Sequence, residues 1–246
     1  MNNLEREYRL KHRQDDLAHF RVVVKETDLD VGIRKERFSP EVIALTEGLA
    51  VKYRRQLEKY ISEDPVFLKT LVPHEVKASA PDIAVAMAEA ARAAGVGPMA
   101  AVAGAFSEAI GKDLLKYSRD ILVENGGDIF LKTKRIRRIG IFAGNSPLSY
   151  RVAVEIRPEE TPAGICTSSG SVGHSLSYGC ADAVVILSKS APLADAVATA
   201  TGNMVRYGSD LEPAVDFALS IPGVTGALAI LDKLMAVKGK VKLVPF

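Results

Sequence analysis

Two oxygen-bearing side chains, Asp195 and Thr199, lie four residues apart in a segment that is almost free of charge. Between residues 164 and 203 the charged side chains are Asp182, Lys189 and Asp195, so the segment is expected to lie inside the molecule, where a carboxylate needs a compensating partner. Positions i and i+4 of a helix project from the same face. A carboxylate and a hydroxyl there, together with backbone carbonyls, form an all-oxygen shell of the kind that Mg²⁺ takes. Asp195 and Thr199 are therefore the candidate metal ligands.

A structural role for Asp195 is the alternative interpretation. Ser190 is a residue type that caps helices, and Pro192 fits the first helical turn, so a helix is expected to begin here. An acidic residue in the first turn stabilises a helix through its dipole without any metal. The spacing alone leaves both interpretations open.

A run of small and hydroxyl-bearing residues, Thr167-Ser168-Ser169-Gly170, precedes that helix. Backbone N–H groups and hydroxyls in a loop can hold a phosphate group, so these four residues are candidate ligand contacts. His174 follows and is the candidate general acid or base, because imidazole titrates near neutral pH. Hydroxyl-rich turns and loop histidines also occur without a ligand. The run lacks a complete Gly-x-Ser-x-Gly motif, which disfavours a hydrolase nucleophile.

The tetrapeptide Asn125-Gly126-Gly127-Asp128 lies between two apolar runs and predicts a hairpin, because its turn needs positive φ angles. The hairpin alone is a sufficient explanation of the glycines. They also permit a ligand to approach the backbone closely, which makes all four residues candidate ligand contacts. A second glycine-bearing turn, at residues 95–98, interrupts two alanine-rich helices.

Strands and helices are expected in clusters rather than in regular alternation, which favours an α+β fold with antiparallel sheets. Residues 164–174 are predicted to form a loop, and the basic residues 132–138 are interpreted as an edge strand whose charges discourage aggregation. Helices are predicted at residues 39–60, 83–94, 99–115, 192–200 and 212–219. Strands are predicted at residues 8–10, 18–25, 31–34, 120–124, 129–132, 137–143, 151–157, 183–187, 227–231 and 241–244.

The whole chain, residues 1–246, is predicted to form one domain. Residues 98–105 resemble residues 192–199, and each stretch follows a loop that contains glycine or serine. One interpretation is an internal duplication with halves of about 1–135 and 136–246. The other is chance similarity between two alanine-rich helices.

Composition excludes several classes of protein. A net charge of +2 and few aromatic residues give no basis for nucleic-acid binding, and the charge is too small to indicate a membrane surface. The sequence has no apolar run of about eighteen residues and no apolar segment at its charged N-terminus, so neither a spanning helix nor a secretory signal is expected. We expect a cytoplasmic protein with two free thiols, Cys166 and Cys180. The sequence is compatible with a homo-oligomer.

Three motifs, in this order, resemble the ApbE family of magnesium-dependent FAD:protein FMN transferases. The first is the turn with Gly97 followed by a helix with Gly104, and the second is Gly126-Gly127-Asp128-Ile129. The third is Ser168-Ser169-Gly170 followed by Ala194-Asp195-Ala-Val-Ala-Thr199-Ala, which resembles the family's magnesium-binding helix. The resemblance extends from about residue 95 to residue 202.

The resemblance implies a fold of two pseudo-repeated T-fold-like units, with antiparallel sheets and packed alanine-rich helices. It implies that Asp195 and Thr199 bind Mg²⁺ together with a carbonyl of the 97–104 turn, and that the ion neutralises the pyrophosphate of FAD or a similar ligand. The resemblance also makes Gly97 and Gly104 candidate ligand contacts. His174 lies near the position at which the family keeps a histidine. Three departures accompany it: Ala103 stands where the family keeps lysine, Glu124 stands where it keeps asparagine, and the usual His-x-x-Asp-Pro-x-Thr-Gly run is absent.

These departures lie at flavin-binding and catalytic positions, so the chain resembles a divergent branch of the ApbE-like proteins. Three hypotheses follow. The first is a pocket for a flavin, FAD or FMN, or for another phosphate-bearing ligand, assisted by Mg²⁺. The second is a non-enzymatic binding or accessory protein whose site has decayed. The third is an enzyme of different chemistry, linked to sulfur assimilation, that uses Cys166 and His174.

Overall fold

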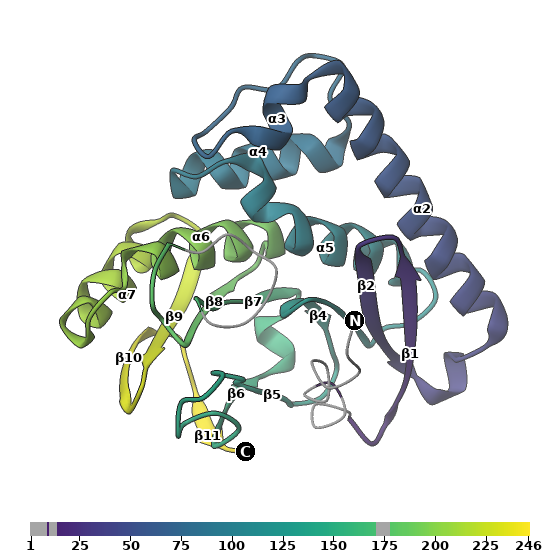
Figure 1. The fold of residues 1–246 in the computed structure, drawn as a ribbon. Coiled ribbons are helices and arrows are strands. Elements are labelled where there is room, and N and C mark those ends of the chain that lie inside the picture. Colours follow the sequence, from purple (N-terminus) through teal and green to yellow (C-terminus); the bar gives the residue numbers. More distant parts are fainter. Residues whose placement is uncertain (1–8, 10–13, 171–177) are drawn as a thin grey trace.

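An eight-stranded antiparallel sheet forms the middle layer of the molecule (Figure 1). The computed structural model describes residue 9 and residues 14–170 and 178–246. Neighbouring strands of this sheet all pair antiparallel, so the predicted α+β class is confirmed. In spatial order the strands are β1 (Leu17–Val24), β2 (Thr27–Arg34), β3 (Ile121–Asn125), β4 (Asp128–Lys132), β7 (Ala163–Ser168), β8 (Ala183–Ser188), β9 (Val224–Leu231) and β10 (Leu234–Gly239).

Helices cover one face of this sheet, with α5 and α6 directly above the strands and α4 above α6 (Figure 1). Alanines on the buried faces of α4 and α6, and Gly104 on α5, let these helices approach closely. The core beneath them includes Phe130, Ile110 and Val197. The helices are α2 (Pro40–Glu63), α3 (Pro65–Lys69), α4 (Asp82–Ala94), α5 (Val102–Leu114), α6 (Ala191–Met204) and α7 (Leu211–Ser220). Short 3₁₀ turns lie at Lys35–Arg37, Pro98–Ala101, Pro158–Glu160 and Gly208–Asp210.

A small sheet lies against the other face of the large one. Its strands are β5 (Arg137–Gly140), β6 (Val152–Ile156) and β11 (Leu243–Pro245), with β6 in the middle. A second apolar core separates the two sheets and includes Leu131, Ile165 and Leu228. The inner strands β8 and β9 are thus buried on both faces, which explains their near-continuous hydrophobic sequences.

The element order is similar in the two parts of the chain. Residues 17–132 form a hairpin, a group of helices and a second hairpin, and residues 163–239 repeat that order. The two sets join edge to edge through the β4–β7 pair, which makes one continuous sheet. This order agrees with the implied pseudo-repeat, and the internal duplication with halves near residue 135 stays a prediction.

Several predicted boundaries were wrong. Ala163–Ser168 is strand β7, although residues 164–174 were predicted to form a loop. Its glycine and hydroxyls obscured the strand pattern, yet Gly164 is required there because a Cβ at this position would lie 2.4 Å from the Cα of Ala191 in α6. β2 begins at Thr27 rather than at Val31, and its acidic residues are paired with Arg9, Arg21 and His19. Strand β10 and helix α3 were not predicted, and the strand predicted at residues 8–10 lies largely outside the described residues.

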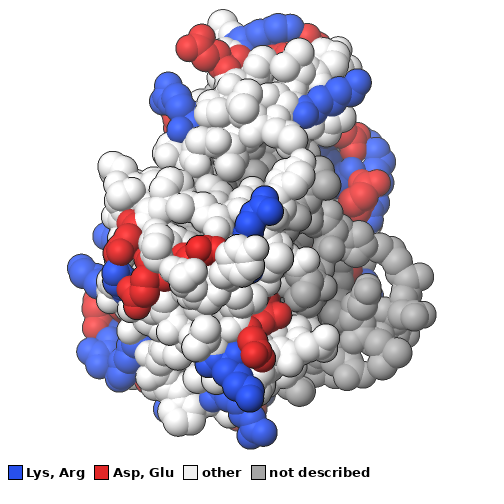
Figure 2. Space-filling model, turned by 60° about the vertical axis from the view of Figure 1, so that its left-hand side comes forward, with Lys and Arg blue, Asp and Glu red and all other residues white. Residues whose placement is uncertain are grey.

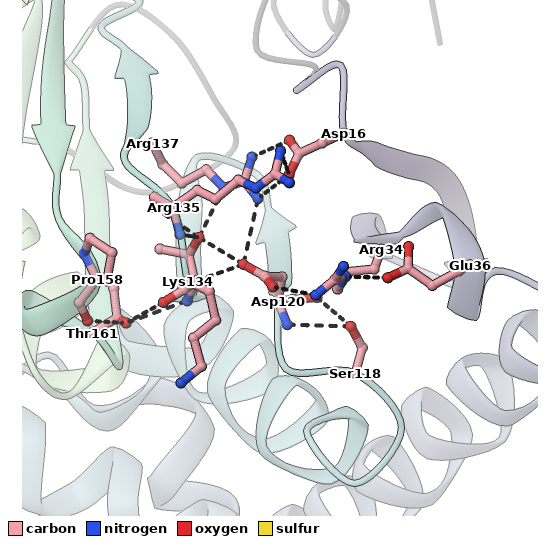
Figure 3. A network of polar contacts seen from close by, with 11 residues as sticks. Asp16, Arg34, Glu36, Ser118, Asp120, Lys134, Arg135, Arg137, Pro158 and Thr161 are labelled. Atoms are coloured by element: carbon pink, nitrogen blue, oxygen red, sulfur yellow. Dashed lines mark hydrogen bonds and ion pairs between the residues drawn. The ribbon is translucent and has the colours of Figure 1, made fainter.

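The basic run at 132–138 only partly behaves as predicted. β5 is an edge strand of the small sheet, but the side chain of Arg137 is 2% exposed. Figure 3 shows its guanidinium between Asp16, at 2.5 Å, and Asp120, at 3.6 Å, while its Nε donates to the hydroxyl of Thr133. This arginine links β5 to the segment before β1. It therefore forms a structural ion pair and is not a solvent-facing charge.

Acidic and basic side chains are interspersed on the face drawn in Figure 2, with broad areas that carry neither. Within residues 14–170 and 178–246, no single helix combines the length and apolarity that a membrane span needs. The segments Asp82–Ala94 and Pro98–Leu114 reach that threshold only when taken together, across a bend of 104°.

Candidate metal and ligand site

Asp195 lies in the first turns of α6, on the side that faces α5. The hydroxyl of Ser190 caps this helix by accepting the N–H of Leu193, as predicted. The Oδ2 atom of Asp195 accepts the backbone N–H of Gly104 at 2.9 Å. Gly104 permits this contact because a Cβ there would lie 2.4 Å from the carbonyl oxygen of Ala191. A glycine on α5 therefore lets α6 come close enough for the bond to form.

Burial dominates the electrostatics of Asp195, which is 8% exposed. Desolvation raises the pKa of its carboxyl to about 7, although the backbone amides of Gly104 and Ala103 act in the opposite direction. Among the described residues no Lys, Arg or His forms an ion pair with it. Within the described part of the chain, its ionised form therefore has backbone amides but no cation to compensate it.

A second buried carboxylate, Asp128, lies beside this site. It is the first residue of β4, and its backbone carbonyl accepts the hydroxyl of Ser107 from α5 at 2.8 Å. Burial and the negative charge of Asp195 raise the pKa of Asp128 well above its usual range, while the thiol of Cys166 and the backbone N–H of Thr167 bond to the carboxylate and lower it. Asp128 and Asp195 thus approach the same region, one from the sheet and one from the helix above it.

The β3–β4 hairpin holds Asp128 in place, and its prediction is confirmed. Asn125 pairs with Asp128, while Gly126 and Gly127 have φ angles of 67° and 107°, the conformation that favours glycine. Glu124 accepts the N–H of Gly127 at 2.7 Å. The amide of Asn125 donates to the carbonyl of Ala103 at 3.4 Å, which links the hairpin to the start of α5.

The hydroxyl-bearing residues lie at the C-terminal end of β7, next to this hairpin. A Cβ at Gly127 would be 3.5 Å from the carbonyl oxygen of Thr167, and a Cβ at Gly202 of α6 would be 3.4 Å from the hydroxyl of Ser168. Thr167, Ser168 and Ser169 are half-buried, and the N–H of Gly170 bonds to the carbonyl of Ala181. The end of β7 therefore lies between the hairpin and α6.

The structure brings most of the predicted site residues together. Gly104, the hairpin, the end of β7 and Asp195 surround one region, and the half-buried Thr199 is one helical turn from Asp195. Gly97 lies elsewhere, because a Cβ there would overlap the carbonyl of Thr70. His174 lies outside the described residues. A role in binding or catalysis stays a prediction for each of these residues.

Sequence reasoning missed two supporting residues on α5. Ser107 bonds to the carbonyl of Asp128, and the buried Glu108 accepts the N–H of Ala191 at 2.6 Å, which fixes the start of α6. Both lie about one turn beyond Gly104, on the same helix face. This spacing from Gly104 is the feature of the sequence that could have identified them. The environment of Cys166 differs from that of a reactive thiol, because burial raises the pKa of the Cys166 thiol well above its usual range.

A metal ion here would need oxygen atoms beyond carboxylates. No group of three or more His, Cys, Asp or Glu side chains in the described part of the chain is arranged to hold one. The carbonyl of Ala103, in the turn expected to supply a ligand, accepts the hydroxyl of Ser107 at 3.0 Å and the amide of Asn125. The available shell consists of carboxylate, hydroxyl and carbonyl oxygens, with water or a bound ligand for the remainder.

The fold is similar to that of solved ApbE proteins. It is similar to the apo form of the flavinyl transferase ApbE from Pseudomonas stutzeri, with a TM-score of 0.60 and 13% identity over 92% of this chain and 95% of that chain. It is also similar to the ApbE protein of Thermotoga maritima, with a TM-score of 0.59 and 14% identity over 91% of this chain and 96% of that chain. At these identities the likeness shows a shared fold.

A model of the family described as AbpE bacteria matches residues 9–232, so the chain belongs to that family. Its relatives include a UPF0280 protein of Methanococcus aeolicus, 36% identical over 230 residues that cover 92% of this chain and 91% of that protein. Another, from Methanocella arvoryzae, is 45% identical over 193 residues, or 77% of each chain. The predicted resemblance to a divergent branch of the ApbE-like proteins is therefore confirmed.

Proposed function

We propose that this protein binds a flavin nucleotide, or another ligand with a phosphate group, with the help of a divalent cation. The ligand lies among the start of α5, the β3–β4 hairpin, the end of β7 and α6. The observation that carries this proposal is Asp195, a carboxylate buried in an ApbE-like fold without a described cationic partner. Burying a carboxylate without a cation is costly, and a bound ion removes that cost.

The residues present fit Mg²⁺ by their chemistry. The carboxylate of Asp195 and the hydroxyl of Thr199 are hard oxygen donors on one helix face, and Mg²⁺ commonly takes few protein ligands and completes its shell with water and phosphate oxygens. When bound, the ion would neutralise phosphate charge and polarise a phosphoryl oxygen. The backbone amides of Ala103 and Gly104 keep the carboxylate of Asp195 oriented and favour its ionised form.

The chain's own groups suit the rest of such a ligand. The hairpin tip at Gly126 is exposed, and Thr167, Ser168 and Ser169 are half-buried, so these backbone N–H groups and hydroxyls are accessible to phosphate oxygens. Glu124 and Asn125 hold the hairpin from behind, through Gly127 and Ala103. The ligand is therefore expected to meet a preformed surface.

Two observations favour binding without FMN transfer as the second candidate function. Ala103 carries no cation at the start of α5, and the buried thiol of Cys166 is not in a setting that favours thiolate chemistry. His174 stays the predicted general acid or base. Self-association also stays a prediction, which light scattering on the purified protein tests.

A calorimetric titration with FAD, FMN and ADP, with and without Mg²⁺, tests this proposal. We expect Mg²⁺-dependent binding that weakens at least about tenfold in Asp195→Asn, the change that one lost charge-assisted contact of roughly 1.4 kcal/mol produces. The matched control is Asp30→Asn, which alters a carboxylate of similar burial that is bonded to His19 on β1. Binding of none of the three nucleotides, or equal binding by wild type and Asp195→Asn, would refute the proposal.

A further inference from the structure

The positions of Asp128 and Asp195 are fixed relative to each other by α5. The N–H of Gly104 bonds to the carboxylate of Asp195, and one turn later the hydroxyl of Ser107 bonds to the backbone carbonyl of Asp128. Asn125, in the same hairpin as Asp128, donates to the carbonyl of Ala103. A single turn of α5 therefore contacts both the hairpin and the start of α6.

Cys166 makes a second connection between the two carboxylates. It lies directly opposite Asp128 in the β4–β7 pair, and its thiol contacts the Asp128 carboxylate. The same sulfur donates to the carbonyl of Ala191 at 3.3 Å, one helical turn before Asp195. The two carboxylates thus lie on opposite sides of one buried contact region, between the sheet and the helix layer.

One oxygen of Asp128 has no hydrogen-bond partner among residues 14–170 and 178–246. Its Oδ1 atom is buried and accepts no hydrogen bond, although the residue is only 7% exposed. A buried carboxylate oxygen without a donor costs free energy, and native proteins leave few such atoms without a compensating ion, water or proton. Asp128 therefore carries a coordination position that the described residues do not fill.

The charges that face this region are unbalanced. Asp128, Asp195 and, more distantly, Glu124 are acidic, and among the described residues only Glu124 of these three pairs with a cation, Arg9. Lys112 is the cation on α5, and its exposed side chain pairs with Glu108. The two central carboxylates therefore require positive charge from outside the described residues.

We propose that Asp128 and Asp195 bind one divalent cation together, with the unpartnered Oδ1 of Asp128 as a direct ligand. This inference rests on the proposed function and extends it, because the β3–β4 hairpin then supplies a second carboxylate to the ion. Two carboxylates balance the charge of a divalent ion, so the ion binds without a nucleotide. Oxygen donors select a hard cation such as Mg²⁺ or Mn²⁺. Ion binding also ties the hairpin to α6.

Electron paramagnetic resonance of Mn²⁺ tests this inference in the absence of any nucleotide, because free Mn²⁺ gives a strong signal that binding removes. We expect the wild type to bind one Mn²⁺ that Mg²⁺ displaces. Asp128→Asn and Asp195→Asn each weaken binding at least about tenfold, and the double variant is no weaker than the worse single variant, because the two residues act on one ion. Asp30→Asn binds as the wild type does.

A second measurement uses the wild type alone and does not depend on how the variants fold. Fe²⁺ with ascorbate and peroxide cleaves a backbone near a bound ion, and mass spectrometry locates the cuts. We expect cuts near residues 126–129 and 194–196, suppressed by Mg²⁺. Cuts near 194–196 alone, or wild-type Mn²⁺ binding by Asp128→Asn, would overturn this inference and leave the proposed function intact. Loss of Mn²⁺ binding in both variants, with no nucleotide bound by the wild type, would support the inference and refute the proposed function.

Discussion

Replacing Gly104 with alanine should separate α5 from α6. The added Cβ would lie 2.4 Å from the carbonyl oxygen of Ala191 and 2.9 Å from the Cβ of Asp195, both on α6. Because one of these atoms is backbone, a side-chain rotation cannot relieve the overlap, and the helices must move apart. Overpacking of this kind costs about 1–3 kcal/mol. The N–H of Gly104 would also lose its bond to the Asp195 carboxylate, a charge-assisted contact worth about 1.5–3 kcal/mol.

The two contributions together give an expected loss of about 2.5–6 kcal/mol, which lowers the Tm of a protein of this size by roughly 5–24 °C. Thermal unfolding followed by circular dichroism measures it. Gly48→Ala is the matched control, because Gly48 lies in the interior of α2 with no atom within 4 Å of its added Cβ. There alanine should stabilise the helix by about 0.5–1 kcal/mol. If Gly104→Ala stabilised the protein as Gly48→Ala does, the proposed close approach of α5 and α6 would be wrong.

Three further outcomes are expected. Burial raises the pKa of Asp195 to about 7, so the folded protein holds a proton there that the unfolded chain releases near pH 4. In EDTA, the stability of the wild type should therefore fall from about pH 4 to pH 7 more steeply than that of Asp195→Asn. Parallel Tm profiles of the two proteins would contradict this. Arg137→Met should cost about 3–5 kcal/mol in urea unfolding, since it leaves buried Asp120 with Arg34, at 3.9 Å, as its remaining cation. Asp120→Asn added to it should restore part of that loss, and no restoration would count against the ion pair. A maleimide should label Cys180 in the native protein and Cys166 only after denaturation, and native labelling of both would argue against the buried thiol.

Local patterns were sufficient to predict the elements with short-range causes. The capped start of α6 depends on Ser190 and Pro192, and the β3–β4 turn depends on two adjacent glycines. The antiparallel class also followed from the order of the elements. In each case the deciding contacts lie within a few residues along the chain.

Contacts between distant residues were beyond sequence reasoning. The sequence predicts Gly164 to be a loop residue. The structure shows that it lies in strand β7, where Ala191 of α6 packs against it. Asp128 is interpreted as part of a turn, and only the fold shows that its side chain is buried beside Cys166 and faces the charge of Asp195. Asp28 and Asp30 are acidic residues in a buried strand, because their partners come from residues 9, 19 and 21. Pairing between segments decides such positions, and no single window of sequence contains it.

The continuous eight-stranded sheet has a consequence for how the site can assemble. β4 and β7 are its two central strands, so Asp128 belongs to the first four strands and Cys166 to the last four, while Asp195 follows the crossing from β8 to α6. Neither part of the chain contains the proposed cation site by itself. A chain cut between β5 and β6 would yield two fragments that each lack an ion site, and cation binding would report their reassociation. Cation binding at the proposed site therefore depends on the pairing of β4 with β7.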